Sequence, residues 1–293
     1  MVARFSIKPP SFHPMLKSDL LDLTLFFDLE WVPDAGAAVR LLGLPAGVSE
    51  REAIEALWKH SGATDENARP FVKYLFSRVV SIAFLSRKIV WRDGVRQVDF
   101  TLNSLPKLPL ETASVDEAYI IERFLHILGE REPNLVGFNS AESDIQVLIQ
   151  RGLIHEVSAP RFCARPDKPW EGRDYFYRYG EQHLDLLRLF SNGNMKPRLD
   201  ELARLCGFPG KLDMDGQQVV DLWLSGDLQG IVEYNQIDTL NTYLVWLRVV
   251  RFCGKIKEED YVDEQYAFRD FLEKESTKPH MQHLGKFLES WEL

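Results

Sequence analysis

The feature that most constrains the fold is a short apolar run, residues 21–27, that leads directly into two carboxylates. The run LDLTLFF has the composition of a buried β-strand. Because strand side chains alternate between faces, Asp28 and Glu30 are expected on one face and Leu29 on the other. Two carboxylates this close repel each other unless a proton or cation lies between them, so the pair is compatible with a Mg²⁺ or Mn²⁺ site, although Asp-x-Glu is common in any acidic chain. The alternative is a pair of solvated acids at a strand end.

The rest of the chain predicts strands first and then alternating strands and helices. Further strands are expected over residues 79–84, 88–91, 98–102, 134–138 and 183–186, and helices over 49–60, 115–128, 199–205, 217–224 and 230–251. Residues 31–34 and 92–94 predict turns, and residues 157–182, which show no period, predict a long loop. This order favours an α/β domain with a mixed sheet.

A third acid follows the expected strand 134–138. Asn139 is predicted at a turn, and Ser140 or Ser143 is expected to cap a helix that carries Asp144 in its first turn and runs to about residue 153. An acid at this place is also favoured by the helix dipole alone. The motif by itself therefore does not require a metal ion.

The fourth acid belongs to the long helix expected over residues 230–251. Tyr234 and Asp238 are four residues apart and share one helix face, at the border of the packed side, which is an unusual place for an unpaired acid. An exposed Tyr–Asp pair is the alternative. If all four acids converge on one sheet edge, they require cations, and two divalent ions roughly 3.5–4 Å apart suit phosphodiester cleavage.

The order of these motifs resembles that of the DEDD exonucleases, in particular their tyrosine-bearing (DEDDy) branch. Residues 27–30 (FDLE) are similar to the first exonuclease motif, residues 135–139 (LVGFN) with Asp144 to the second, and Tyr234 with Asp238 to the third. The chain most resembles the predicted 3′–5′ exonucleases related to the proofreading domain of family B DNA polymerases, over roughly residues 21–250. It departs from those proofreading domains at Ser143, where they usually carry an aromatic residue.

The resemblance implies a ribonuclease H-like (DnaQ-like) fold, with a mixed five-stranded sheet flanked by helices. It also implies hydrolysis from the 3′ end that releases nucleoside 5′-monophosphates, with two divalent ions, Mg²⁺ or Mn²⁺, as cofactors. The implied catalytic residues are Asp28, Glu30, Asp144, Tyr234 and Asp238, and the four acids among them are the implied metal ligands. Tyr234 is expected to orient the attacking water. The implied substrate contacts are Phe138, Asn139 and Lys211, although Lys211 is equally explained as a solvated loop lysine.

The expected partner is a nucleic-acid 3′ end, with single-stranded DNA favoured and RNA possible. Residues 160–200 alternate cations and aromatic rings, which suits a single strand, unless the rings seal this loop onto the core. Asp185 is interpreted as a structural cap or as a support for the metal ligands, and not as a ligand itself, and His183 is interpreted as structural. Exoribonuclease activity and a catalytically silent nucleic-acid-binding scaffold remain as alternatives, and an internally cutting endonuclease is less favoured.

Three regions are expected: an irregular arm (1–20), an exonuclease domain (21–252) and an acidic, helical extension (253–293). The three scattered cysteines and the absence of a long apolar span predict a cytoplasmic protein without a membrane segment. A polymerase domain does not fit beside the exonuclease domain, so any role in DNA repair is expected of a separate chain. The net charge of −9 argues against tight coating of duplexes.

Overall fold

The computed structural model describes residues 15–16, 20–112, 114–168, 171–177, 180, 182–190, 195–212 and 216–291, so most of the expected N-terminal arm lies outside the described residues. A five-stranded sheet with the order β3-β2-β1-β4-β5 forms the centre. Its strands are β1 (Leu23–Pro33), β2 (Ser77–Arg92), β3 (Val95–Leu105), β4 (Asn134–Gly137) and β5 (His183–Asp185). β1 pairs antiparallel with β2 and parallel with β4, which confirms the mixed sheet.

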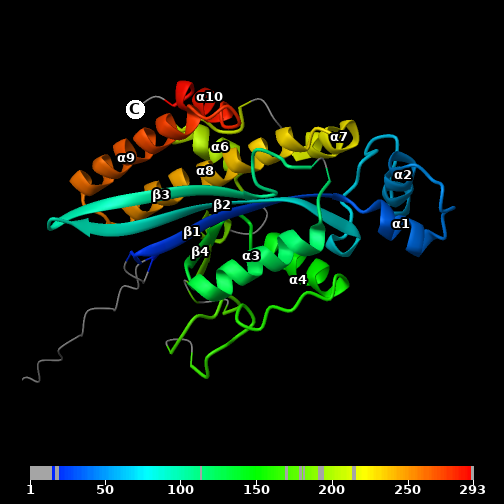
Figure 1. Cartoon of the computed structure of the whole chain (residues 1–293), viewed down its shortest axis with the longest axis horizontal. Coiled ribbons are helices and arrows are strands. Elements are labelled where there is room, and N and C mark those ends of the chain that lie inside the picture. Colours follow the sequence, from blue (N-terminus) through cyan, green and yellow to red (C-terminus); the bar gives the residue numbers. More distant parts are fainter. Residues whose placement is uncertain are drawn as a thin grey trace, which may run out of the picture.

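Helices cover both faces of this sheet (Figure 1). On one face lie α3 (Glu117–Arg131) and α4 (Asp144–Ile154), and on the other α6 (Leu199–Leu205), α7 (Val219–Ser225), α8 (Leu228–Phe252), α9 (Glu258–Ser276) and α10 (His283–Glu289). The short helix α5 (Leu186–Phe190) follows β5 directly. Within the part of the chain that the structure describes, no helix has the length and apolar character needed to cross a membrane.

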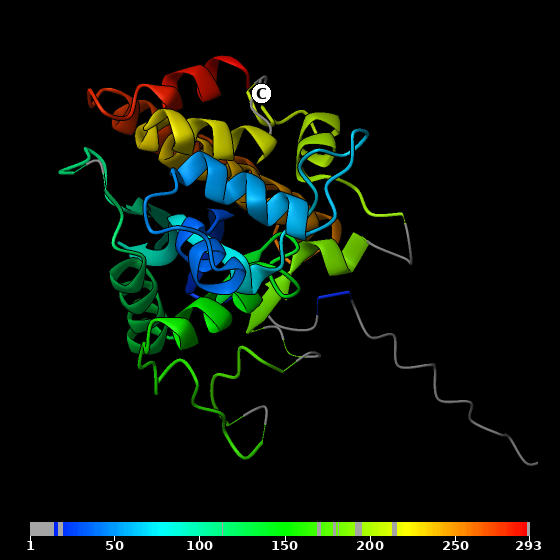
Figure 2. The same cartoon turned by 90° about the vertical axis from the view of Figure 1, so that its right-hand side faces the viewer.

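Two further helices, α1 (Ala35–Leu42) and α2 (Glu50–His60), are inserted between β1 and β2 and lie at one end of the sheet. They stand in front when this end faces the viewer (Figure 2). The expected start of α2 is confirmed by a capping box, in which the Ser49 hydroxyl accepts from the Glu52 amide and the Glu52 carboxylate accepts from the Ser49 amide.

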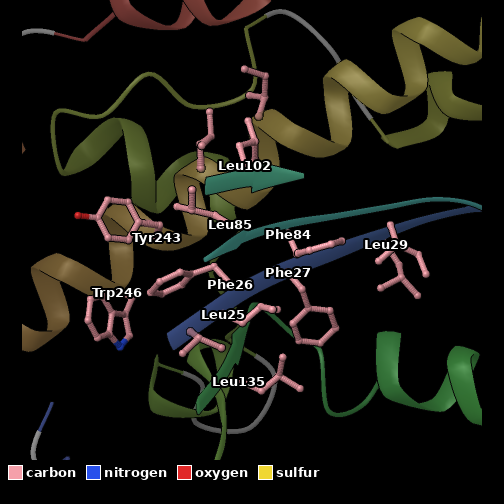
Figure 3. Packing of buried hydrophobic residues seen from close by; sticks show 14 of the residues in the cluster. Leu25, Phe26, Phe27, Leu29, Phe84, Leu85, Leu102, Leu135, Tyr243 and Trp246 are labelled. Carbon is pink, nitrogen blue, oxygen red and sulfur yellow. The ribbon is translucent and has the colours of Figure 1, made fainter. Parts of the chain in front are cut away.

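The apolar run at the start of β1 is buried on both faces because β1 is the central strand (Figure 3). The Phe26 ring lies edge-on against Tyr243 and Trp246 of α8, with centroids 5.2 and 5.0 Å apart. The Phe27 ring contacts Phe124 of α3 at 5.6 Å. Since side chains alternate, the face that buries Phe26 against α8 also carries Asp28 and Glu30.

Two predictions about the strands were wrong. β1 continues through the turn expected at residues 31–34, with a register shift between Glu30 and Trp31. Residues 79–84 and 88–91 belong to the single strand β2, and Arg87, which lies between the two expected strands, is fully buried against Glu264. The turn at residues 92–94 is confirmed by positive φ angles at Asp93 and Gly94.

The C-terminal extension is helical, and its helices pack into the same core as the sheet. Phe268 of α9 and Leu284 and Phe287 of α10 are fully buried there. A buried ion pair adds to this packing, since Glu264 of α9 accepts from the Arg87 guanidinium of β2 at 2.5 and 2.8 Å. Arg96 of β3 donates to the same carboxylate at 2.8 Å.

Replacement of Glu264 by Ala is expected to lower the free energy of unfolding by about 3–5 kcal/mol, because Arg87 is then buried without a counter-ion. The measurement is urea unfolding. The exposed Glu259, at the start of the same helix, provides the control, and E259A should change stability little. The double variant R87M/E264L should lose less than E264A. A loss of under about 1 kcal/mol in E264A would contradict the assigned role of the pair.

A second prediction concerns His283, whose imidazole contacts the Gln236 side-chain oxygen at 2.7 Å and joins α10 to α8. Burial lowers the pKa of His283 from 6.5 to about 4. Between these values the unfolded chain binds the proton and the folded chain does not, so this stability is complete above pH 6.5 and is lost as the pH falls towards 4. Between pH 7 and 5 the loss from this residue should be about 2 kcal/mol. Urea unfolding of H283Q at both pH values should show a correspondingly smaller decrease than wild type, and parallel decreases would contradict the prediction.

Candidate active site

A cavity of about 540 Å³ lies where the two acids of β1 meet the start of α4 and the first turns of α8. Its lining includes every acid that the sequence singles out, together with Tyr234 and Lys211. The sheet brings these segments together because β1 pairs with β4, whose end leads into α4, while α8 packs across β1 and β2.

Three of the four acids form one compact group. Oxygen atoms of Asp28, Glu30 and Asp238 lie within 4.8 Å of one another. Asp28 and Glu30 are half-buried, and Asp238 is buried with one oxygen, Oδ1, that has no hydrogen-bond partner among the described residues. A buried carboxylate oxygen without a partner is costly, so this oxygen is available to a cation.

Neighbouring side chains contact one oxygen of Asp28 and one oxygen of Asp238. The Asn235 amide donates to Asp28 Oδ2 at 2.7 Å, and the Ser81 hydroxyl on β2 donates to Asn235 Oδ1 at 2.9 Å. Lys211 Nζ lies 2.9 Å from Asp238 Oδ2. These contacts orient two of the carboxylates, and sequence reasoning missed Asn235, which looked like an ordinary residue of the helix.

Asp144, the fourth acid, is the first residue of α4, as expected, but lies outside the compact group of three. The Leu29 amide donates to its Oδ1 at 3.0 Å and the Ser143 hydroxyl to its Oδ2 at 2.5 Å. Neither expected serine cap forms, because Ser143 binds Asp144 and the Asn139 carbonyl, while Ser140 binds His183.

Tyr234 lies one helical turn before Asp238, and its ring packs in a small apolar cluster with Val32, Val80 and Ile231. Lys211 Nζ donates to its hydroxyl and lies 4.8 Å from the ring centroid. Burial and the charges of the nearby acids raise the pKa of the Tyr234 phenol far above its ordinary value. The phenol is therefore neutral at any working pH and acts through hydrogen bonds.

Burial and mutual repulsion raise the pKa values of the carboxylates. Burial raises the pKa of both Asp28 and Glu30 well above the ordinary range, and the neighbouring acids raise it further. Burial also raises the pKa of Asp144 to about 6. For Asp238 burial raises the pKa, against the opposing charge of Lys211. One lysine does not balance the acids, which leaves excess negative charge in the cavity.

These donors fit a hard divalent cation. Carboxylate oxygens are the ligands that Mg²⁺ and Mn²⁺ prefer, and the excess negative charge and the free Asp238 Oδ1 both favour such an ion. Asp28, Glu30 and Asp238 are the residues that would hold it.

Of the remaining residues that the sequence analysis named, some line the cavity and others hold the backbone around it. Phe138 and Asn139 line the cavity. Asp185 accepts from the backbone amides of Asn139, Ala141 and Leu187 at 2.8–3.1 Å, which makes it structural, as expected. His183 contacts the Ser140 hydroxyl at 2.9 Å and is structural too.

In the described part of residues 160–200, several of the rings and cations that were expected to hold the substrate strand serve the core or ion pairs instead, which was the alternative for this segment. Phe162 and Tyr175 are buried against each other in the core, and Arg165 pairs with Asp174. Trp170, Arg178 and Tyr179 lie outside the described residues. Of the described part of this segment, only residues from Leu187 onward, Arg198 among them, line the cavity. Phe162 and Tyr175 pack inward, and the Tyr175 hydroxyl donates to the Pro133 carbonyl, directly before β4, at 2.9 Å.

The comparison with protein families identifies the chain. Residues 69–291 match the family described as predicted 3′–5′ exonucleases related to the exonuclease domain of PolB, and the chain belongs to this family. It is thus a hydrolase that acts on phosphodiester bonds, and its sheet and flanking helices are consistent with a ribonuclease H-like exonuclease fold. A search of the curated proteins gives no match. The matched range begins after Asp28 and Glu30, which the fold nevertheless brings beside Asp238.

Asp28→Asn is expected to stabilise the metal-free protein, because it removes one charge from the crowded group while an amide oxygen still accepts from Asn235. The free energy of unfolding in EDTA should rise by about 1 kcal/mol. Mn²⁺ at a hundred times its Kd should stabilise wild type by about 2.7 kcal/mol and the variant hardly at all. Urea unfolding with and without Mn²⁺ measures both effects, and the exposed Asp65 supplies the control D65N. Equal stabilisation of D28N and wild type by Mn²⁺ would refute the assigned ligand.

Proposed function

We propose that this protein is a metal-dependent 3′–5′ exonuclease that removes nucleoside 5′-monophosphates from the end of single-stranded DNA. The observation that carries the proposal is the group of three carboxylates within 4.8 Å, with Asp144 and Tyr234 on the same cavity wall. Trimming of RNA ends is the second candidate. A function in DNA repair and a cytoplasmic location stay predictions from the sequence.

The proposed ligands are Asp28, Glu30 and Asp238 for one divalent ion, Mg²⁺ or Mn²⁺, and Asp28 with Asp144 for a second. Such ions, when bound, lower the pKa of the attacking water and neutralise charge on the phosphate. Each oxygen of Asp144 accepts one hydrogen bond from the chain and keeps a further lone pair, so Asp144 could reach the ion directly or through water.

Asn235 and Lys211 are positioning residues in this proposal, because they hold Asp28 and Asp238 through one oxygen each. Tyr234 orients the water that attacks the terminal phosphate, and the raised pKa of its phenol excludes it as the base. The bond between phosphorus and the 3′ oxygen of the preceding nucleotide breaks. That oxygen leaves as a 3′ hydroxyl, and the released nucleotide keeps its 5′ phosphate.

Incubation of 5′-labelled single strands and duplexes of DNA and RNA with Mg²⁺ or Mn²⁺ tests the reaction. Wild type should produce a ladder that shortens from the 3′ end, fastest on single-stranded DNA, and D28N should produce none. Y234F should retain Mn²⁺ binding by calorimetry and lose roughly ten- to a hundredfold in rate, because the proposed contact to the water is removed together with the hydrogen bond from Lys211.

Three outcomes would contradict the proposal. A full rate in Y234F would refute the role of the tyrosine. Cleavage of circular single strands would indicate an endonuclease. A folded wild-type protein that neither binds Mn²⁺ nor shortens any strand would favour a silent nucleic-acid-binding domain.

A further inference from the structure

A row of three aromatic rings leads out of the carboxylate cavity. Trp31 follows Glu30 directly on β1, and its ring lies edge-on to Tyr74, with centroids 5.8 Å apart at 87°. Tyr74 in turn lies edge-on to Phe71, at 5.2 Å and 90°. All three residues line the same cavity as the acids. We call these three residues the aromatic row.

The outer ring of this row is unusually open. Phe71 is 66% exposed, although it lies beside a cavity that offers apolar contacts. Edge-on packing also leaves ring faces that no neighbouring ring of the row covers. Isolated exposed aromatic residues are common on proteins. Here three rings that contact one another line the same cavity and form a continuous surface.

The backbone directly after Tyr74 is held by two hydrogen bonds from other elements. The Arg151 guanidinium, which is buried, donates to the Leu75 carbonyl at 3.2 Å. The Asp34 amide donates to the Phe76 carbonyl at 2.7 Å. A surface that is held in position before binding loses little entropy when a ligand stacks on it.

The chemistry of the cavity indicates what the row binds. Tyr74 lies close enough to Asp144 that this charge, together with burial, raises the pKa of its phenol. The row begins at Trp31, next to Glu30, and ends at the exposed Phe71. Arg198 and Lys211 also line the cavity and offer positive charge to phosphates.

We infer that Trp31, Tyr74 and Phe71 stack against the bases of an unpaired 3′ strand whose end lies among the carboxylates. This inference rests on the proposed function and specifies its substrate: bases in a duplex are already stacked and paired, so only an unpaired end can use the row. The occupant is a single-stranded nucleic acid, with the bases supplying the contact.

The test is a binding cycle that combines the variant F71A with loss of bases in the ligand. The probes are 5′-fluorescein-labelled single-stranded oligonucleotides with a normal 3′ end or with abasic residues at the last 3′ positions. Fluorescence anisotropy in Ca²⁺ without Mg²⁺ gives the Kd. F71A should weaken binding of the normal oligonucleotide roughly tenfold. Wild type should lose a similar factor on the abasic probe, and F71A should lose little more on it.

The control variant is W91A, since Trp91 is 68% exposed at the end of β2 and does not line the cavity. It should bind both probes as wild type does, and thermal unfolding should show that both variants are folded. Three results would overturn the inference. The first is that the losses from F71A and from the abasic ends are additive, and the second is an unchanged Kd in F71A. The third is that wild type binds the abasic probe as tightly as the normal one. Failure of wild type to shorten strands in Mn²⁺ would instead refute the proposed function, because the cycle reports stacking without cleavage.

Discussion

The crowding of negative charge along the second half of β1 is the constraint on which the rest of the site depends. Asp28, Glu30 and Asp238 lie within 4.8 Å of each other, in surroundings that disfavour each charge. A chain that only maximised stability would not keep them, since nothing in the packing of the sheet requires them. The surrounding residues are arranged to make this group tolerable. Asn235 and Lys211 each bind one carboxylate oxygen and leave the others directed at the centre.

The helix α8 carries Asp238 and also fixes the loop between α6 and α7, from which Lys211 comes. One turn after Asp238, the fully buried Asn241 exchanges two hydrogen bonds with the backbone of Gly210, at 3.1 and 2.9 Å. Gly210 has a φ of +71°, and a Cβ there would lie 2.5 Å from the Asp200 carboxylate, which binds the Lys211 amide. Asn241 and Asp200 thus fix the backbone of Gly210 and of Lys211. Because the glycine allows the close turn, the Lys211 side chain reaches Asp238.

Much of the fold was predictable because its signals are local. The β1 run, the capping box of α2 and the turn at residues 92–94 depend on neighbouring residues alone. The errors arose where a distant partner decides the outcome. The strand β2 was expected as two strands, and Arg87 between them is buried in its middle by a counter-ion, Glu264, that is 177 residues away in sequence. The site shows the same division: the acids could be predicted from their spacing, whereas Asn235 and the row from Trp31 to Phe71 become visible only when the chain is folded, since their role is set by contacts across elements.

The acidic composition and the proposed substrate are compatible if the protein holds a strand chiefly by its bases. Much of the affinity of typical nucleic-acid-binding proteins comes from neutralised phosphates, and a chain with a net charge of −9 has little of that to offer. Several cations that the sequence suggested for this purpose are paired with neighbouring acids, as Arg165 is with Asp174. Stacking on Trp31, Tyr74 and Phe71 does not depend on net charge, and binding through it weakens less with added salt than binding through many phosphate contacts. Repulsion between the surrounding acids and the rest of the strand then favours short contacts at the 3′ end over tight binding along its length, which suits an enzyme that releases one nucleotide at a time.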